Sequence, residues 1–379
     1  MDIGIVLSLM GGLGFFLYGM KLMSDGLEKA AGAKLRGILE FFTKNQLMGT
    51  LVGIVFCAII QSSSATTVMV VSFVNSGLMN LYQAAGVIMG ANIGTTITSQ
   101  LVAFNLSEAA PVFLMGGVIM VMFCKKPVVN KIGEVILGFG VLFMGLSIMS
   151  GSMSDLRNSP LIVNALSTLN NRFLAIFIGF LLTAIIQSSS VTVSILLLMA
   201  QQGLLGLGIC FYVILGCNIG ACTSALLASL SGKKDAKRAA MIHLYFNLIG
   251  TVAFMVLFYM INAAVHFPFM AQMATPATIA ITHSVFNITA TLVWLPFSNL
   301  LVKLACLTIR DDKVDEISRE DQEFMILESR FLEKPAFAVE QGRNAAKHME
   351  QDSRKILDIA LGLIYSYSDE QAERVQKLE

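Results

Sequence analysis

The sequence predicts an all-α polytopic membrane protein with two inverted-topology repeats, each with a re-entrant helical hairpin and a broken transmembrane helix. Three observations support this fold class. The 379 residues are 55% hydrophobic and only 13% charged, whereas soluble domains are about 25% charged. Apolar runs long enough to cross a bilayer recur along the chain. The segment Ala-Ile-Ile-Gln-Ser-Ser-Ser occurs twice, at 58–64 and at 184–190.

The charges divide the chain into a membrane body and a water-facing tail. Residues 310–379 hold 17 acidic and 11 basic residues, whereas the preceding 309 residues hold 8 and 15. We therefore expect repeat one at 1–125, repeat two plus the final spans at 126–306, and a cytoplasmic helical tail at 307–379. In the tail, 320–330 and 336–364 have the pattern of amphipathic helices. The first apolar run lacks the basic region and cleavage site of a signal peptide, so we interpret it as a retained span.

Seven segments are predicted to span the membrane: 3–24, 82–104, 109–124, 130–150, 207–230, 238–262 and 275–305. Two further stretches, 46–75 and 172–201, carry Gln-Ser-Ser-Ser near their centres. As single spans they would place four polar side chains at mid-membrane depth. We favour two half-length helices with the motif at the turn, because irregular backbone is tolerated there only under protein cover or beside a water-lined cavity.

The Lys and Arg residues test this arrangement. With the hairpins not crossing, one side of the membrane carries nearly all of them and the other side carries Arg157 and Arg172. The positive-inside rule then places the N-terminus outside and the tail in the cytoplasm. Span 3–24 would run inward and its repeat partner 130–150 outward, so the repeats would be inverted. The basic side collects Lys21, Lys29, Lys34, Arg36, Lys44, Lys125, Lys126, Lys131, Lys233, Lys234, Lys237 and Arg238.

The duplication extends beyond the tetrapeptide. At the same offset of 126 residues, Gly90-x-Asn92-Ile-Gly94 matches Gly216-x-Asn218-Ile-Gly220, and Gly53 matches Gly179. Inverted repeats with interrupted helices are typical of secondary transporters, whose binding sites lie near the membrane midplane.

The hairpin turns are the predicted substrate site. Serine is a preferred N-cap, and the first N–H groups of a helix together with its dipole attract anions. Amide and hydroxyl side chains add neutral donors. The candidate substrate-binding residues are Gln61, Ser62, Ser63, Ser64, Thr66 and Asn92 in repeat one, and Gln187, Ser188, Ser189, Ser190, Thr192 and Asn218 in repeat two.

The Gly-x-Asn-Ile-Gly segments are predicted to unwind and to bind Na⁺. Glycine weakens a helix and asparagine competes for backbone hydrogen bonds, so carbonyl oxygens would become available. The alternative is that these small residues only allow close helix packing. The candidate Na⁺ ligands are Ser64, Asn92, Thr95, Thr96, Ser190, Asn218, Thr223 and Ser224; Thr98 follows in the same segment.

Two late spans each carry a His and an Asn one turn apart, His243 with Asn247 and His283 with Asn287. Polar residues inside a span are candidates for function. We expect these four to support the site from behind its ligands. Structural hydrogen bonding between helices, a place on the ion or substrate path, and proton coupling are the three interpretations left open.

The predicted site has no Lys or Arg near the middle of any span. Two helix N-termini supply about half a charge each, roughly +1 together. A divalent anion would remain under-compensated there, so cations would have to enter with it. Hydroxyl, amide and carbonyl oxygens suit Na⁺.

These motifs, together with His243-Leu-Tyr-Phe-Asn247, resemble the type II sodium–phosphate cotransporters in their bacterial branch, over about residues 1–305. The resemblance implies Na⁺-driven import of inorganic phosphate by alternating access, in a bacterial inner membrane, with phosphate held by the two Gln-Ser-Ser-Ser turns. It also implies a PhoU-like cytoplasmic domain, for which this tail is too short to be a complete bundle. Ala221-Cys222 replaces the two threonines that are usual in the family, which puts a hydroxyl contact to Na⁺ there in doubt.

Several alternatives stay open at this stage. The chain could transport another oxyanion or couple to H⁺, or it could be a channel. An intramembrane serine hydrolase is a remote alternative, because no Gly-x-Ser-x-Gly elbow is present. The expected partners are phosphate, sodium ions and the lipid bilayer, with a homodimer as a further option. No basic patch of the nucleic-acid type is present.

Overall fold

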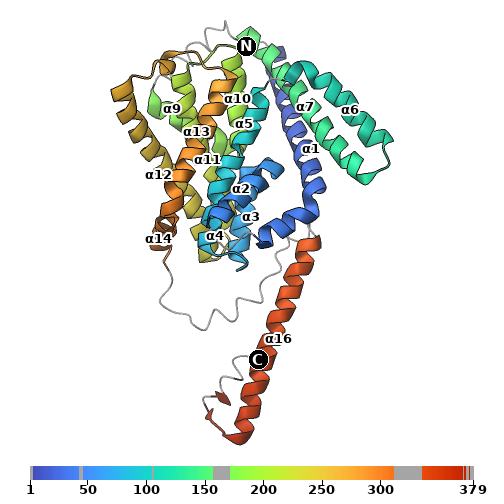
Figure 1. The fold of residues 1–379 in the computed structure, drawn as a ribbon, viewed down its shortest axis with the longest axis vertical. Coiled ribbons are helices and arrows are strands. Elements are labelled where there is room, and N and C mark those ends of the chain that lie inside the picture. Colours follow the sequence, from blue (N-terminus) through green and yellow to red (C-terminus); the bar gives the residue numbers. More distant parts are fainter. Residues whose placement is uncertain are drawn as a thin grey trace. The chain divides into compact units, whose positions relative to one another are not determined.

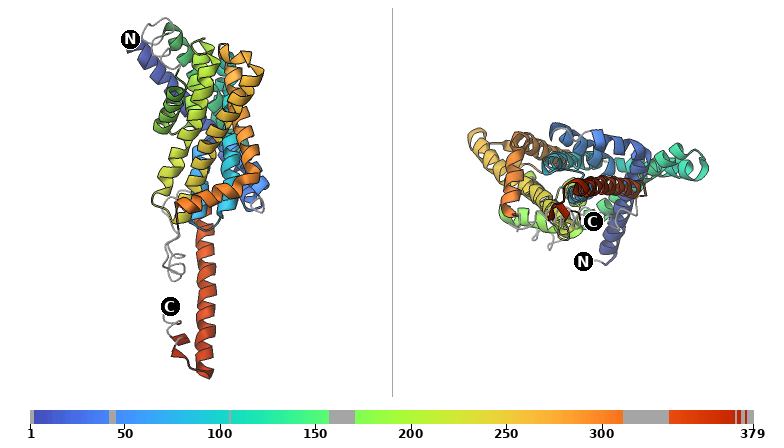
Figure 2. Two further views of the ribbon diagram at one scale, coloured as in Figure 1. Left: turned by 90° about the vertical axis from the view of Figure 1, so that its left-hand side faces the viewer. Right: turned by 90° about the horizontal axis from the view of Figure 1, so that it is seen from below.

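The computed structural model describes residues 3–41, 46–104, 106–156, 171–310, 335–369, 371–372 and 375. The chain forms two compact units, Met1–Arg310 and Asp311–Glu379. Within the described residues, the regular secondary structure of the first unit is helical, and an isolated bridge joins Gly206 and Met273. In Figure 2 its long helices run roughly side by side.

The first half of this unit contains α1 (Ile3–Phe41), α2 (Gln46–Ile60), α3 (Ser63–Asn75), α4 (Leu81–Gly94), α5 (Thr96–Ala103), a 3₁₀ turn η1 (Leu106–Ala109) and α6 (Ala110–Phe123). The second half contains α7 (Pro127–Leu156), α9 (Arg172–Ile186), α10 (Ser189–Gln201), α11 (Leu207–Ser229), α12 (Lys234–Val265), η2 (Pro268–Ala271), α13 (Pro276–Trp294), η3 (Leu295–Phe297) and α14 (Ser298–Thr308).

Six segments of the described chain are long and apolar enough to cross a bilayer, which makes this a membrane protein. They are Ile3–Lys29, Leu106–Phe123, Pro127–Met153, Leu207–Ser229, Lys234–Val265 and Pro276–Thr308. The seventh predicted span, 82–104, is divided into α4 and α5 at Thr95. The first helix continues far beyond the apolar run predicted at 3–24, because good helix formers follow it as far as Phe41.

Each stretch that carries Gln-Ser-Ser-Ser forms two short helices with the motif at the turn, as predicted. The first stretch gives α2 and α3, and the second gives α9 and α10. Figure 1 shows α2 and α3 in the lower half of this unit, and α9 and α10 in the upper half.

The predicted unwinding at Gly-x-Asn-Ile-Gly is wrong in repeat two, where α11 continues unbroken through Gly216 and Gly220. In repeat one the interruption is slight. Thr95 keeps right-handed helical torsion angles, and its N–H still donates to the Ala91 carbonyl at 3.0 Å. The glycines serve close packing instead. A Cβ on Gly216 would lie 1.9 Å from the carbonyl oxygen of Ile176 in α9.

The same close approach occurs in repeat one, at positions shifted by 126. A Cβ on Gly90 would lie 2.0 Å from the carbonyl oxygen of Thr50 in α2. In both repeats, therefore, the first short helix packs directly against the backbone of the helix that carries the Gly-x-Asn-Ile-Gly motif.

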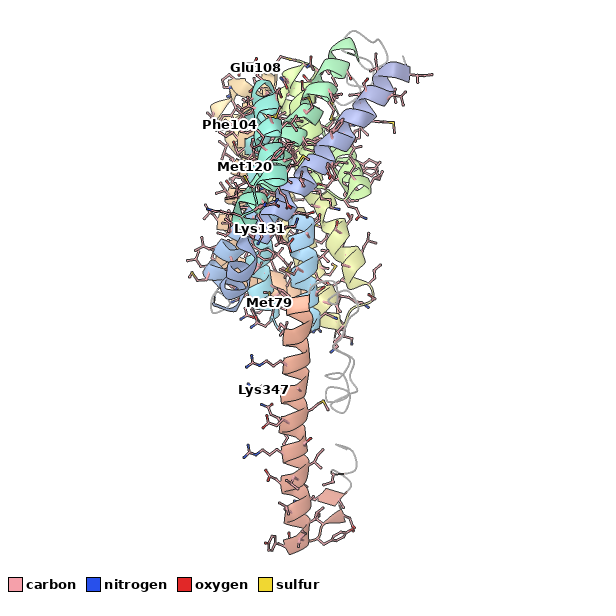
Figure 3. All side chains as sticks on the ribbon, turned by 90° about the vertical axis from the view of Figure 1, so that its right-hand side faces the viewer. Met79, Phe104, Glu108, Met120, Lys131 and Lys347 are labelled. Atoms are coloured by element: carbon pink, nitrogen blue, oxygen red, sulfur yellow. The ribbon has the colours of Figure 1, made fainter. Side chains whose placement is uncertain are left out.

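Helices α1 and α7 pack closely along their length. A Cβ on Gly12 would lie 3.0 Å from the carbonyl of Gly145, and one on Gly19 would lie 2.8 Å from that of Gly138. The two helices are therefore antiparallel at this contact. Shifting either pair by the repeat offset generates the other pair. Nearby, Lys131 Nζ donates to the Lys29 carbonyl at 2.8 Å, and Lys29 forms a 2.7 Å ion pair with Glu134; Figure 3 labels Lys131 at this end of α7.

The second unit contains α16 (Pro335–Tyr365), which carries Lys347 (Figure 3). This helix corresponds to the predicted helix 336–364. The other predicted tail helix, 320–330, lies outside the described residues.

Candidate functional site

The first motif forms a tight turn between α2 and α3, which we call tip one (Gln61–Ser64). Gln61 ends α2 with a left-handed backbone, φ 57°. Ser62 is the N-cap of α3, and its side-chain oxygen accepts from the Ala65 N–H at 3.1 Å. The N-cap prediction is therefore confirmed, and the first N–H groups of α3 lie at the turn.

The second motif, tip two (Gln187–Ser190), has the same backbone. Gln187 also has φ 57°. Ser188 caps α10 with φ −147° and ψ 109°, against −147° and 107° for Ser62. Ser188 accepts from the Val191 N–H at 3.4 Å. The two turns are the same local structure built twice.

The two tips meet. The Ser64 hydroxyl of tip one donates to the Gln187 carbonyl of tip two at 3.1 Å. A second link joins the repeats, because the Thr95 and Ser190 hydroxyls lie 3.2 Å apart. Residues 123 and 95 positions apart in the chain are thereby in contact. The structure thus brings the candidate residues of both motifs into one region, where two helix N-termini converge.

The glutamines of the two tips have different surroundings. Gln61 is 8% exposed, and its side-chain oxygen accepts from the Thr98 hydroxyl at 2.8 Å. Its side-chain nitrogen donates to the Ala58 carbonyl. The side chain of Gln187, by contrast, is exposed.

Several candidate hydroxyls donate to the backbone of their own helix. Thr66 and Thr192 donate to the carbonyls of Ser62 and Ser188, at 2.8 and 3.2 Å. Thr96 and Thr223 donate to carbonyls three residues earlier, those of Ile93 and Gly220. These hydroxyls retain acceptor lone pairs but have no free proton to offer. Ser63 and Ser189 are buried at the starts of α3 and α10.

Four buried asparagines share one geometry. Each donates its side-chain N–H to the carbonyl four residues earlier, at 2.9 to 3.1 Å. The residues are Asn92, Asn218, Asn247 and Asn287, on α4, α11, α12 and α13. Because the amide nitrogen is held by the helix, the side-chain oxygen is turned away from it. The oxygens of Asn247 and Asn287 are buried without a hydrogen-bond partner, so each can accept from a donor or bind a cation.

The two histidines are fully buried and differ in their contacts. His283 lies beside α5, with its Nδ1 2.9 Å from the Ser99 hydroxyl. Neither ring nitrogen of His243 has a partner, although its backbone carbonyl lies 3.4 Å from Cys222 Sγ. His283 thus makes a structural bond between helices, which is one of the three predicted interpretations. The ring of His243 makes no such bond between helices.

The site is electrically neutral. Among α2, α3, α4, α5, α9, α10, α11 and α13, the charged side chain is Arg172, at the first residue of α9. Helix α12, which carries His243 and Asn247, has its charged residues at its start, at 234–238. In the part of the chain that the structure describes, no three His, Cys, Asp or Glu side chains cluster as a metal site. Helix termini and neutral polar groups must therefore provide any anion binding here.

Sequence reasoning missed three contributors. Thr183 of α9 donates to Thr192 of α10 at 3.0 Å, next to tip two. Ser99 contacts His283, and Gln100 donates to the Ala280 carbonyl and to Ser284. The available signal was that Ser99 and Gln100 are polar residues within the predicted span 82–104. They lie just beyond the duplicated motif, so the duplication itself gives no signal at their positions.

Comparison with known proteins identifies the family. The family model described as "Na+/Pi-cotransporter" matches residues 15–151 and 158–304. The "Uncharacterized protein YqeW" of Bacillus subtilis is 35% identical over 300 residues, which are 78% of this chain and 95% of that protein. The "Putative inorganic phosphate export protein YjbB" of Escherichia coli is 24% identical over 310 residues, or 81% of this chain; the match spans 56% of that protein's length.

A third relative is the human "Sodium-dependent phosphate transport protein 2B", 39% identical over 106 residues, which are 27% of this chain and 15% of that protein. No solved structure matches the chain. The family model covers both repeats and most of the membrane body. The chain belongs to the Na⁺/Pi-cotransporter family.

Proposed function

We propose that this chain is a sodium-coupled symporter that imports inorganic phosphate by alternating access, with phosphate bound between tip one and tip two. The meeting of the tips carries the proposal. Ser64 of tip one bonds to Gln187 of tip two, so the N-terminal ends of α3 and α10 converge from different repeats. Each brings free N–H groups and a positive dipole end. Because the family is one of transporters, the serine hydrolase interpretation is set aside.

The proposal includes re-entrant hairpins and inverted repeats. Helices α2 and α9 have 15 residues each, about 22 Å at 1.5 Å per residue, which is short of a hydrocarbon core of about 30 Å. Antiparallel packing of α1 with α7, with contacts that repeat at the 126-residue offset, favours a two-fold axis perpendicular to these helices. For membrane-spanning helices such an axis lies in the membrane plane. We place the N-terminus outside and residues 307–379 in the cytoplasm, by the positive-inside rule.

Sodium coupling follows from the charge of the site. Two helix N-termini provide roughly +1. The helices that form the tips or carry the Gly-x-Asn-Ile-Gly motifs add no Lys or Arg apart from Arg172, and the basic residues of α12 lie at its start, at 234–238, well before Asn247. Divalent phosphate needs further positive charge in a low-dielectric site. The asparagine oxygens described above are hard neutral ligands that suit Na⁺. Unlike carboxylates, they would not repel the phosphate anion.

Contacts between helices pair these asparagines. Thr291 of α13 donates to the Met89 carbonyl of α4 at 3.3 Å. Two turns earlier on α13, His283 lies 2.9 Å from Ser99 of α5, the helix that follows α4. Asn287 and Asn92 both lie between these two anchor points, so they lie at similar levels. In repeat two, Asn247 donates to Cys222 Sγ at 3.4 Å, one turn from Asn218. We propose one Na⁺ near Asn92 and one near Asn218, with Asn287 and Asn247 beside them.

The direction of transport has a second candidate. One relative is named for phosphate export and another for sodium-dependent transport. A symporter moves substrate in the direction of its driving ion gradient, and an inward Na⁺ gradient drives import. We therefore favour import, and we treat export as the competing outcome of the experiment.

The experiment is uptake of labelled phosphate into proteoliposomes that contain the full chain. We expect an inward Na⁺ gradient to raise initial uptake at least about tenfold over equal choline, with excess sulfate competing poorly. Uptake that ignores Na⁺ and collapses with a protonophore would favour H⁺ coupling instead. Efflux from loaded vesicles that no inward Na⁺ gradient reverses would favour export.

A further inference from the structure

Thr98, which donates a hydrogen bond to Gln61, has a counterpart in repeat two that makes no hydrogen bond through its side chain. Thr98 donates to the Gln61 side-chain oxygen at 2.8 Å, and Thr98 is 1% exposed. The offset of 126 residues assigns Ser224 as the partner of Thr98, just as it assigns Gln187 as the partner of Gln61. Both members of the repeat-two pair could therefore form the same hydroxyl-to-amide bond.

In this structure the repeat-two pair is apart. The Ser224 hydroxyl is buried without a hydrogen-bond partner, although serines inside helices commonly bond to a carbonyl of the preceding turn. The carbonyl four residues before it, that of Gly220, accepts from Thr223 at 2.7 Å. The side chain of Gln187 is exposed. A buried hydroxyl without a partner is unfavourable, so an arrangement in which Ser224 finds an acceptor would regain a bond.

The backbone does not explain this difference. Both glutamines have φ 57°, and both following serines are N-caps with the same torsion angles within 2°. Helix α4 also packs against α2, and α11 against α9, through the same glycine contact. The two tips thus have one backbone structure and two states of the glutamine side chain.

We propose that Thr98 and Ser224 are paired positioning residues for the transported anion, and that each holds the glutamine of its own tip in one of two alternating states. In the state described here, Thr98 holds Gln61 and Gln187 is released. In the other state, Ser224 holds Gln187 and Gln61 is released. Because each state makes one bond of the same kind and loses the other, the two states stay close in free energy, as a carrier that cycles requires.

This inference rests on the proposed function for its role in transport, but its structural part is testable without phosphate. The variants are Thr98→Val, which keeps the shape and removes the hydroxyl, and Ser224→Ala. Thr98→Ser and Ser224→Thr keep a hydroxyl. Thr282→Val is a matched control, because Thr282 donates to the Thr278 carbonyl at 2.7 Å within its own helix.

The first readout is hydrogen–deuterium exchange of peptides that cover 57–66 and 183–192, on the full chain without phosphate. Thr98→Val should raise exchange at tip one and lower it at tip two, by about threefold or more, and Ser224→Ala should leave tip one protected. The hydroxyl-retaining variants should restore the wild-type pattern. Equal exchange in Thr98→Val and in the Thr282→Val control at both tips would overturn the proposal, whatever the wild type transports.

The second readout is a double-variant cycle on phosphate transport. Each single variant biases the two-state equilibrium in one direction, so turnover should fall about tenfold and the external KM should move in opposite directions for the two. The variant with both changes restores the balance and should recover to within about threefold of wild type. If the turnover of the double variant falls by the product of the two single losses, the two positions act independently and the proposal is overturned. If Thr98→Val does not fold, Thr98→Cys enters the same cycle. A wild type that moves no phosphate contradicts the proposed function and leaves the exchange result to decide this inference.

Discussion

The two repeats share their backbone contacts but differ in the polar side chains at their centre. The glycines at 90 and 216 make the same approach to a facing carbonyl, at 2.0 and 1.9 Å from a notional Cβ. The polar links are unequal. Thr95 contacts Ser190 at 3.2 Å, but the equivalent of this pair is Ala221 with Ser64, and Ala221 has no hydroxyl. Ser64 donates to the Gln187 carbonyl instead.

This difference separates two requirements on the same fold. Helix packing has to be duplicated, because each repeat must bury the same surfaces with the same close backbone approach. The polar contacts at the tips need not be duplicated, since in the arrangement described here the two repeats contact different partners. Changes to the framework should therefore affect both repeats alike, and changes at the tips should affect them unequally.

The largest effect is expected at the framework glycines. Gly90→Ala and Gly216→Ala each place a methyl group about 2 Å from a backbone carbonyl oxygen. A backbone atom cannot move aside as the end of a flexible side chain could. Each should cost about 3 kcal/mol or more, because the overpacking cannot relax. Thermal unfolding in detergent measures this. Gly116→Ala is the control, since a Cβ there meets no atom within 4 Å. Markedly different losses in the two repeats would contradict the shared framework.

The second effect separates the two tips. Gln61→Ala and Gln187→Ala should each abolish phosphate transport, because both line the proposed site. Only Gln61→Ala should also raise hydrogen exchange at tip one without phosphate, since in the state described here Gln61 and not Gln187 is held by a buried hydroxyl, that of Thr98. Transport and hydrogen exchange of the same preparations test both statements. If either variant transports normally, the two-tip phosphate site is wrong.

Much of this arrangement could be predicted from the sequence, because duplication and polarity are local signals. Gln-Ser-Ser-Ser inside an apolar run predicted two short helices with motif serines as N-caps, and the structure gives this role to Ser62 and Ser188. Unwinding at Gly216–Gly220 was predicted wrongly. Glycine weakens an isolated helix, but in α11 close packing against α9 compensates for that cost. Sequence alone cannot separate these two uses of glycine.

The difference between Gln61 and Gln187 was not predictable either. Identical motifs predict identical local structure, and the backbone angles agree. The unequal surroundings arise from contacts between segments far apart in sequence, such as Thr98 with Gln61 across 37 residues and Thr95 with Ser190 across 95. Such contacts depend on how the whole chain packs, which the local sequence does not specify.

The smallest expected effect concerns the link between Thr95 and Ser190, whose equivalent pair has an alanine at 221. Thr95→Ala removes a buried hydroxyl contact and leaves Ser190 Oγ without it, so stability should fall by about 1–2 kcal/mol. The reciprocal change, Ala221→Ser, adds a hydroxyl opposite Ser64, which already has an acceptor in the Gln187 carbonyl. It should therefore alter stability by less than about 1 kcal/mol. Thermal unfolding of both variants in Na⁺ and in choline measures the pair. Equal destabilisation by the two changes would mean that the repeats are linked symmetrically, against the arrangement described here. If Thr95→Ala alone lowers stability, and lowers it more in Na⁺ than in choline, an ion binds beside this link in repeat one. Repeat two would then have no equivalent ion.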